Sequence, residues 1–157
     1  EMELDLVNIF EEVLDEIIKK DGDIPKRGRS ERLFANRLSC NIQSKLDLLC
    51  QNKYNLRADS PYNKHLNNTK MIKENRIEVD LAVHKRGTDE FNLLVVELET
   101  NNNPSKDDIW KLETMTKAND EYKYKLGLYL VLGIENRAGE IIEKIWYVDG
   151  EKVDLIK

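Results

Sequence analysis

The stretch RIEVDLAVHKRGTDEFNLLVVELET, residues 76–100, decides the fold, because it has the pattern of two β-strands joined by a tight turn. Apolar and polar residues alternate on both sides of a turn sequence that contains glycine and aspartate. Acidic side chains nevertheless lie within the strands themselves, at Glu78, Asp80, Glu97 and Glu99. A hairpin that gathers like charges in this way requires a physical explanation.

The register of the hairpin predicts how these acids meet. If residues 87–90 form the loop, Asp80 lies opposite Glu97 and Glu78 lies opposite Glu99. Side chains alternate along a strand, so all four carboxylates project from one face at one end of the ribbon. Directly opposed residues have Cβ atoms about 5 Å apart. The register therefore predicts an acidic cluster.

The two faces of this ribbon differ in character. One face is apolar and is predicted to be core: Ile77, Val79, Leu81, Val83, Leu94, Val96 and Leu98. The acidic face also becomes apolar further along the ribbon, through Ala82, Leu93 and Val95. The carboxylates are thus expected at the rim of a face that is otherwise covered.

Two interpretations of the acidic cluster stay open. Opposed like charges destabilise a strand pair, and a divalent cation would offset their repulsion. Mg²⁺ accepts one or two protein carboxylates and leaves its other positions to water and phosphate oxygens, as in metal-assisted phosphodiester hydrolysis. The alternative is that the strand ends separate into solvent and the acids are simply hydrated.

The rest of the chain predicts helices around a sheet. Apolar spacings of three and four predict a helix over 3–20 and a second from a Ser30 N-cap to about residue 50. Residues 54–59 are predicted to form a strand and 62–70 a loop. A third helix is predicted to start at Ser105, with Ile109, Leu112 and Met115 facing inward.

The last third of the chain is predicted to add two strands. KLGLYLVLG, residues 125–133, has the apolar run of a strand covered on both faces, and ENRAGE turns it back into IIEKIWYV, residues 141–148. Strand, helix and strand in succession imply a parallel pair, while the hairpins add antiparallel neighbours. The predicted fold class is α/β, a mixed sheet flanked by helices.

Composition bounds the protein class. The 157 residues are the size of one domain, residues 1–157, and the net charge of −5 argues against a protein that coats nucleic acid. Membrane-length apolar runs and a signal-type N-terminus are lacking, so a cytoplasmic protein without membrane association is expected. Cys40 and Cys50 are predicted to be reduced, and His84 to be a structural polar residue.

A basic segment and one further acid have two interpretations each. PKRGRSER carries Lys26, Arg27, Arg29 and Arg32, which either form a solvated loop beside a helix or face phosphate. Glu31 follows on the apolar stripe of the second helix. Its carboxylate either complements the positive end of that helix or points into a site.

The hairpin, together with DDIWKLETMT and YKYKLGLYLVLG, looks like the core of the PD-(D/E)XK superfamily, the restriction-endonuclease-like nucleases and their small bacterial and phage relatives. SERLFANRLSCNIQ is similar to the helix that precedes this core in those relatives. The resemblance covers roughly residues 30–135 and implies an αβββαβ core with a mixed sheet.

The resemblance also implies roles for individual residues. Asp80 matches the metal-binding Asp, Glu97 the second acid, and Glu31 a glutamate that many members carry on the preceding helix. Glu99 stands where the family has its catalytic lysine, although some members use Glu there as a metal ligand or base. Lys111 lies where relatives often carry a lysine or glutamine that faces the site.

Two functions follow as expectations. The first is a Mg²⁺- or Mn²⁺-dependent DNA nuclease, for which the resemblance allows a homodimer, since many nucleases of this fold act as dimers. Asp80, Glu97, Glu99 and Glu31 would hold the metal, and Lys111 and the basic segment would contact phosphate. The second is a catalytically inactive binding module, such as a regulator, immunity protein or anti-defence factor, with a protein or nucleic-acid partner.

Overall fold

A computed structural model of the chain describes residues 2–21, 31–49, 54–65, 68–69, 71–72 and 75–155. Lys26, Arg27 and Arg29 of the basic segment, the expected cap Ser30 and Cys50 lie outside these ranges. Over the described parts of the chain, the search for a helix that is long and apolar enough to cross a membrane finds none.

The two long helices were predicted closely. α1 spans Met2–Asp21 and α2 spans Glu31–Leu49. The main strands are β1 (Arg57–Asp59), β6 (Leu81–His84), β7 (Leu94–Thr100), β8 (Leu126–Leu132), β9 (Ile141–Val148) and β10 (Glu151–Val153). The connecting elements are α3 (Ile109–Met115) and the 3₁₀ turn η2 (Glu135–Arg137).

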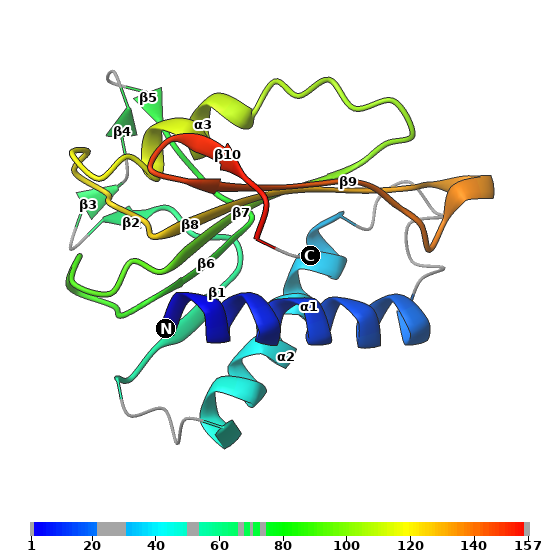
Figure 1. Cartoon of the computed structure of the whole chain (residues 1–157), viewed down its shortest axis with the longest axis horizontal. Coiled ribbons are helices and arrows are strands. Elements are labelled where there is room, and N and C mark those ends of the chain that lie inside the picture. Colours follow the sequence, from blue (N-terminus) through cyan, green and yellow to red (C-terminus); the bar gives the residue numbers. More distant parts are fainter. Residues whose placement is uncertain are drawn as a thin grey trace.

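A six-stranded mixed sheet forms the centre of the protein. Its strand order is β1-β6-β7-β8-β9-β10, and β7 and β8 are its parallel pair. Figure 1 shows α1 and α2 on one side of the sheet and α3, which connects β7 to β8, on the other. The predicted α/β class with helices flanking a mixed sheet is therefore confirmed.

Two apolar layers hold the helices against the sheet. The layer under α1 and α2 includes Phe10, Phe34 and Leu38 from the helices and Leu94, Leu128 and Trp146 from the strands. The layer under α3 includes Leu112 and Met115 from the helix and Val95, Tyr129 and Tyr147 from the strands. The sheet is thus buried on both faces, as the apolar run of β8 predicted.

The register of β6 against β7 agrees with the prediction. Leu81 pairs with Val96, Ala82 with Val95 and Val83 with Leu94, in antiparallel orientation. Continued by one residue, the same register sets Asp80 beside Glu97. Beyond Val83 and Leu94 the regular pairs stop, but the N–H of Lys85 still donates a hydrogen bond of 3.2 Å to the carbonyl of Phe91, close to the predicted turn.

The prediction for the residues before β6 was wrong. Ile77 and Val79 were expected on the same face as Leu81, but they pack in the α3 layer while Leu81 packs against α1 and α2. Val79 forms an isolated bridge with Tyr62, with two backbone hydrogen bonds of 2.9 Å, and Asp80 lies at a bend. The chain therefore leaves β7 at Asp80.

Two further local predictions were wrong. The third helix begins at Ile109 rather than at Ser105, and its N-cap Asp108 makes no side-chain capping hydrogen bond. Part of the expected loop 62–70 pairs instead, as the short strands β2 (Lys64–His65) and β3 (Asn68–Thr69). A second such pair is β4 (Met71–Ile72) with β5 (Asn75–Arg76).

A charged cluster fastens the edge strand β1 to β6. His84 Nε2 lies 2.7 Å from Asp59 Oδ2, and the Arg86 guanidinium donates to both oxygens of the same carboxylate. The ring of Tyr62 lies against His84, with 4.1 Å between centroids. His84 is 1% exposed, so its imidazole is a structural group, as predicted.

Replacing Asp59 should weaken this edge in a pH-dependent way. Burial alone raises the pKa of Asp59, but the hydrogen bonds from His84 and Arg86 outweigh it and hold that pKa well below its usual range. The ionised carboxylate therefore stabilises the fold above pH about 4, and this contribution is lost as the pH falls below it. Asp59→Asn should lower the free energy of unfolding at pH 7 by about 2 kcal/mol.

Urea unfolding of both proteins at pH 7 and pH 3 measures this effect. The difference between the wild type and Asp59→Asn should shrink at pH 3, because the Asp59 carboxylate of the unfolded chain binds a proton there while the folded carboxylate stays ionised, which favours unfolding of the wild type. An equal difference at both pH values would show that the charge of Asp59 is not the stabilising feature.

Candidate functional site

Asp80 and Glu97 come together at the point where the chain leaves the β6–β7 ladder. Glu97 lies on the α3 side of β7, in the middle of the sheet, and is 4% exposed. Asp80 precedes β6, and its Oδ2 accepts a hydrogen bond of 2.7 Å from the backbone N–H of Leu98. This bond fixes the Asp80 carboxylate against β7.

The two carboxyl groups are hydrogen-bonded to each other, which requires one of them to carry a proton. Burial, and then the charge of Asp80, raise the pKa of Glu97 to about 9. Burial also raises the pKa of Asp80, but the Leu98 N–H bond and Lys111 act against it. The proton therefore resides on Glu97, the more deeply buried of the two.

Glu97 has one oxygen that the fold leaves unsatisfied. Oε1 is buried and has no hydrogen-bond partner. Its nearest cation is Lys111 Nζ of α3, at 3.8 Å, and that ammonium lies closer to Asp108 Oδ1, at 3.2 Å. Lys111 thus faces the carboxyl pair from the neighbouring helix through a long ion pair and without a hydrogen bond to Glu97 Oε1.

Glu31 approaches the pair from the start of α2. Its Oε2 accepts a hydrogen bond of 3.4 Å from Thr100 Oγ1, at the end of β7. Burial and then the charge of Asp80 raise the pKa of Glu31. Glu31 is also the acidic residue in the first turn of α2, so its position agrees with both interpretations left open for this residue.

The carboxylate of Glu99 is fixed by hydrogen bonds to two neighbouring residues. Its Oε2 accepts a hydrogen bond from the hydroxyl of Tyr129, and its Oε1 accepts one of 3.3 Å from the N–H of Ser105. Tyr129 is 1% exposed, so this contact is fixed in the core. Among the four acids predicted to hold a metal, Glu99 is thus the one for which both oxygens accept hydrogen bonds within the described ranges.

The structure does not bring Glu78 into this group. Its side chain is exposed, and the nearest cation is Arg32, at 4.0 Å. The expected pairing of Glu78 with Glu99 fails because the bend at Asp80 takes the chain toward Tyr62. Arg32 is itself exposed, and among the four basic residues of the predicted segment it is the one that the structure describes.

The carboxyl pair fits a divalent cation in its chemistry. Within the described ranges, no group of three or more His, Cys, Asp or Glu side chains has the arrangement of a metal site. Mg²⁺ needs only one or two carboxylates, and the unsatisfied Glu97 Oε1 beside Asp80 offers such a donor set. A cation there would replace the proton that now holds the two groups together.

Some residues around the pair were not predicted. Asp108 holds Lys111, while Tyr129 and Thr100 orient Glu99 and Glu31. Tyr129 carried a weak signal, because it is the polar residue inside the apolar run of β8. Thr100 carried no signal, since its partner Glu31 lies on another element, whereas the i,i+3 spacing of Asp108 and Lys111 was a signal that could have been used.

Comparison of the chain with protein-family models, with curated proteins and with solved structures finds no match in any of the three.

The buried carboxyl pair should make the protein less stable as the pH rises. Folded Glu97 keeps a proton up to pH about 9, whereas the unfolded chain releases it above about 4.5, its ordinary pKa. The stabilisation that comes from protonated Glu97 is therefore fully present below pH about 4.5 and decreases as the pH rises from there to about 9. Glu97→Gln, which keeps a donor but cannot ionise, should be more stable than wild type at pH 8 by about 1–3 kcal/mol.

Chemical unfolding at pH 5 and pH 8, in buffer with EDTA, measures this difference. Glu78→Gln is the matched control, because Glu78 is an exposed acid of the same segment. A stability change from pH 5 to pH 8 that is the same in wild type and Glu97→Gln would contradict the buried proton.

Proposed function

We propose that this protein is a divalent-cation-dependent nuclease that hydrolyses phosphodiester bonds in DNA. The observation that carries the proposal is the buried Asp80–Glu97 pair, with one Glu97 oxygen unsatisfied and Lys111 facing it. Paired carboxylates beside a lysine are the groups that metal-assisted phosphoryl chemistry needs. The site would act in the cytoplasm on nucleic acid.

The order of the elements supports a restriction-endonuclease-like fold. α2, β1, β6, β7, α3 and β8 follow one another as helix, three main strands, helix and strand, the αβββαβ order of that core. Glu97 lies on β7 and Asp80 directly precedes β6, the two neighbouring strands on which the resemblance places the acid pair. This assignment remains part of the proposal.

Each residue would have a distinct role. Asp80 and Glu97 would hold Mg²⁺ or Mn²⁺, which supplies Lewis-acid polarisation of the phosphate when bound. The Lys111 ammonium would offset the charge that develops on the phosphate, in place of the lysine that the family carries at the position of Glu99. Its bond to Asp108 keeps it on the α3 side of the pair.

Glu99 and Glu31 would assist from outside the pair. Glu99 keeps unused lone pairs on its oxygens after it accepts from Tyr129 and Ser105, so it can act as a further ligand or a general base. Glu31 would be an outer ligand. Both would work from positions that the fold fixes.

One observation favours the second candidate, an inactive binding module. Glu99 is tied on both oxygens, and a glutamate at this position provides no positive charge. In that case the acidic cluster would be a binding surface for a basic protein partner. Metal binding separates the two candidates, because the module has no requirement for a divalent cation.

Removing either member of the pair should abolish the activity. We expect Mg²⁺- or Mn²⁺-dependent cleavage of plasmid DNA to fall by at least about a hundredfold in Asp80→Ala and in Glu97→Ala, because each removes a metal ligand. Glu78→Ala is the matched control and should cleave like wild type. Cleavage by either pair variant at the wild-type rate would refute the assignment.

Calorimetry with MnCl₂ provides the second readout of the same variants. The wild type should give a saturable heat, and Asp80→Ala should give none. A wild type that binds no Mn²⁺ at millimolar concentration would favour the binding module over the nuclease.

Lys111 should affect turnover rather than metal binding. Lys111→Met retains much of the apolar stem and removes the charge, so kcat should fall by about ten- to a thousandfold while the Mn²⁺ heat persists. Lys117→Met, just beyond the same helix, is the control and should leave kcat unchanged. If Lys111→Met keeps the wild-type kcat, the ammonium has no part in the reaction.

A further inference from the structure

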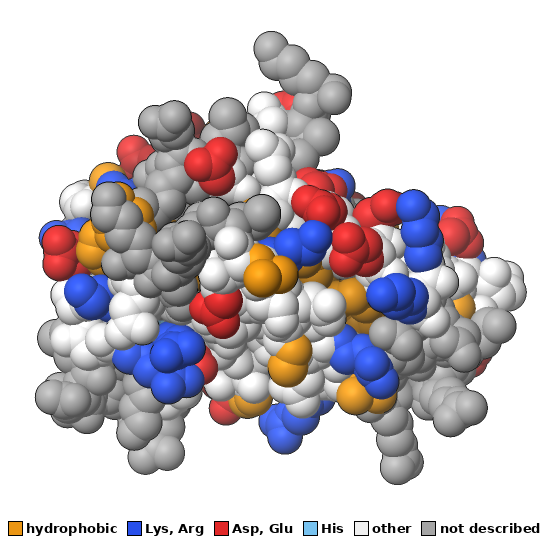
Figure 2. Space-filling model, turned by 90° about the horizontal axis from the view of Figure 1, so that it is seen from below, with side chains coloured by type: hydrophobic (Ala, Val, Ile, Leu, Met, Phe, Trp, Pro, Cys, Tyr) orange, Lys and Arg blue, Asp and Glu red, His pale blue; other side chains and the backbone are white. Residues whose placement is uncertain are grey.

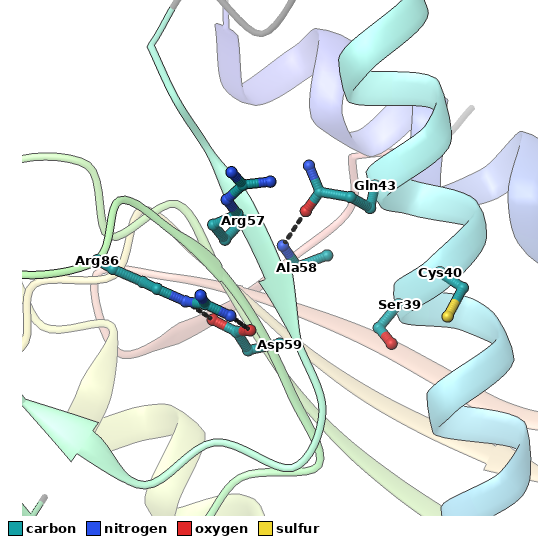
Figure 3. A pocket seen from close by; sticks show the side chains of 7 residues that line it. All are labelled: Ser39, Cys40, Gln43, Arg57, Ala58, Asp59 and Arg86. Carbon is teal, nitrogen blue, oxygen red and sulfur yellow. Dashed lines mark hydrogen bonds and ion pairs between the residues drawn. The ribbon is translucent and has the colours of Figure 1, made fainter.

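A second polar feature lies at the β1 edge of the sheet, where α2 passes this strand. It is an open cavity of about 370 Å³. Its lining includes Ser39, Cys40 and Gln43 from α2, Arg57 and Asp59 from β1, and Arg86, two residues beyond the end of β6. Figure 3 shows the two arginine side chains on one side of β1 and the α2 side chains on the other.

The two arginines differ in their partners. Arg86 is held by the Asp59 carboxylate, which neutralises its charge. Arg57 is partly buried, and with the described residues it forms neither an ion pair nor a side-chain hydrogen bond. One guanidinium charge at this cavity is therefore uncompensated by its described neighbours, and a partly desolvated charge of this kind favours an anionic ligand.

The strand that carries Arg57 is fixed from the helix side. Gln43 Oε1 accepts a hydrogen bond of 2.8 Å from the N–H of Ala58, and Gln43 Nε2 donates one of 3.2 Å to the carbonyl of Leu56. The backbone on either side of Arg57 is thus bonded to α2. One wall of the cavity is therefore held in place by hydrogen bonds within the fold.

The chemistry of the cavity selects a phosphate group. A guanidinium binds phosphate oxygens through two parallel N–H donors, and Arg86 leaves donors beyond those that Asp59 uses. The cavity is open, so it can admit one phosphate of a long polymer while the rest of the strand stays outside. Lining groups from α2 are uncharged: a hydroxyl, a thiol and an amide.

The cavity is also close to the carboxyl pair. Asp59 pairs with Ala82, two residues from Asp80, and the hydroxyl of the next residue, Ser60, donates to the carbonyl of Asp80. With strands about 4.8 Å apart and about 3.3 Å per residue, the two places are on the order of 10 Å apart. A nucleic-acid strand spans that distance within a few nucleotides.

We infer that the Arg57–Arg86 cavity binds a backbone phosphate of the DNA substrate, at a few nucleotides from the cleaved bond. This inference rests on the proposed nuclease function. Arg57 would be the main contact, and Arg86, aligned by Asp59, the second. The site fixes the path of the strand over the β1 edge and takes no part in the chemistry.

DNA binding without cleavage tests the inference. The anisotropy of a short fluorescein-labelled DNA duplex is measured against wild type and Arg57→Gln in EDTA over a series of salt concentrations. Arg57→Gln should weaken binding about three- to tenfold and reduce the slope of log K against log salt by about one. Arg137→Gln, in the turn between β8 and β9, is the matched control and should change neither.

A second variant keeps both arginines, so that weaker binding cannot be explained by a folding defect caused by the loss of Arg57. Cys40 is exposed on α2, so Cys40→Glu should fold normally and place a negative charge at the cavity. It should weaken binding to a similar extent. The inference is overturned if Arg57→Gln and Cys40→Glu both bind DNA like Arg137→Gln.

The outcomes separate this inference from the proposed function. If the wild type cleaves DNA with Mg²⁺ and the cavity variants bind normally, the nuclease stands and the cavity has no role. If the wild type neither binds nor cleaves DNA, both fail together.

Discussion

The antiparallel register of β6 against β7 is the constraint on which the rest of the arrangement depends. Three consecutive pairs, from Leu81–Val96 to Val83–Leu94, set which side chains enter the two apolar layers. The same register brings Asp80 and Glu97 side by side. A shift by one residue would exchange the faces of β6, moving its core residues to the α3 side and separating the acids.

The site combines opposing electrostatic requirements. Burial under α3 disfavours two charges, so the pair holds a proton, while Lys111 lies nearby to partner the charge that remains. Such an arrangement costs stability compared with an apolar pair. Functional sites commonly bear this kind of cost, because the groups are arranged for a ligand rather than for the empty fold. Figure 2, viewed from the side of α1 and α2, shows acidic and basic side chains interspersed, in contrast to this concentration of acids.

Local patterns in the sequence were enough to predict the β6–β7 register, the helices α1 and α2 and the parallel β7–β8 pair. They could not predict the bend at Asp80, because this bend depends on Val79 pairing with Tyr62 across a long connection. For the same reason Glu78 was misplaced. The Asp59–His84 contact could not be predicted from the sequence either, since the register of β1 on β6 is set by packing and not by a short turn. Asp59 and His84 each looked like an ordinary strand polar residue.

The side-chain amide of Gln43 determines whether a further strand can be added to the sheet at β1. By bonding the N–H of Ala58 and the carbonyl of Leu56, it occupies hydrogen-bonding positions that a seventh strand would use. Another copy of the chain, or a stretched peptide, cannot extend the sheet past β1 without first displacing α2. Self-association by strand addition is thereby blocked at this border, and the cavity above it stays open to ligands that bind through side chains.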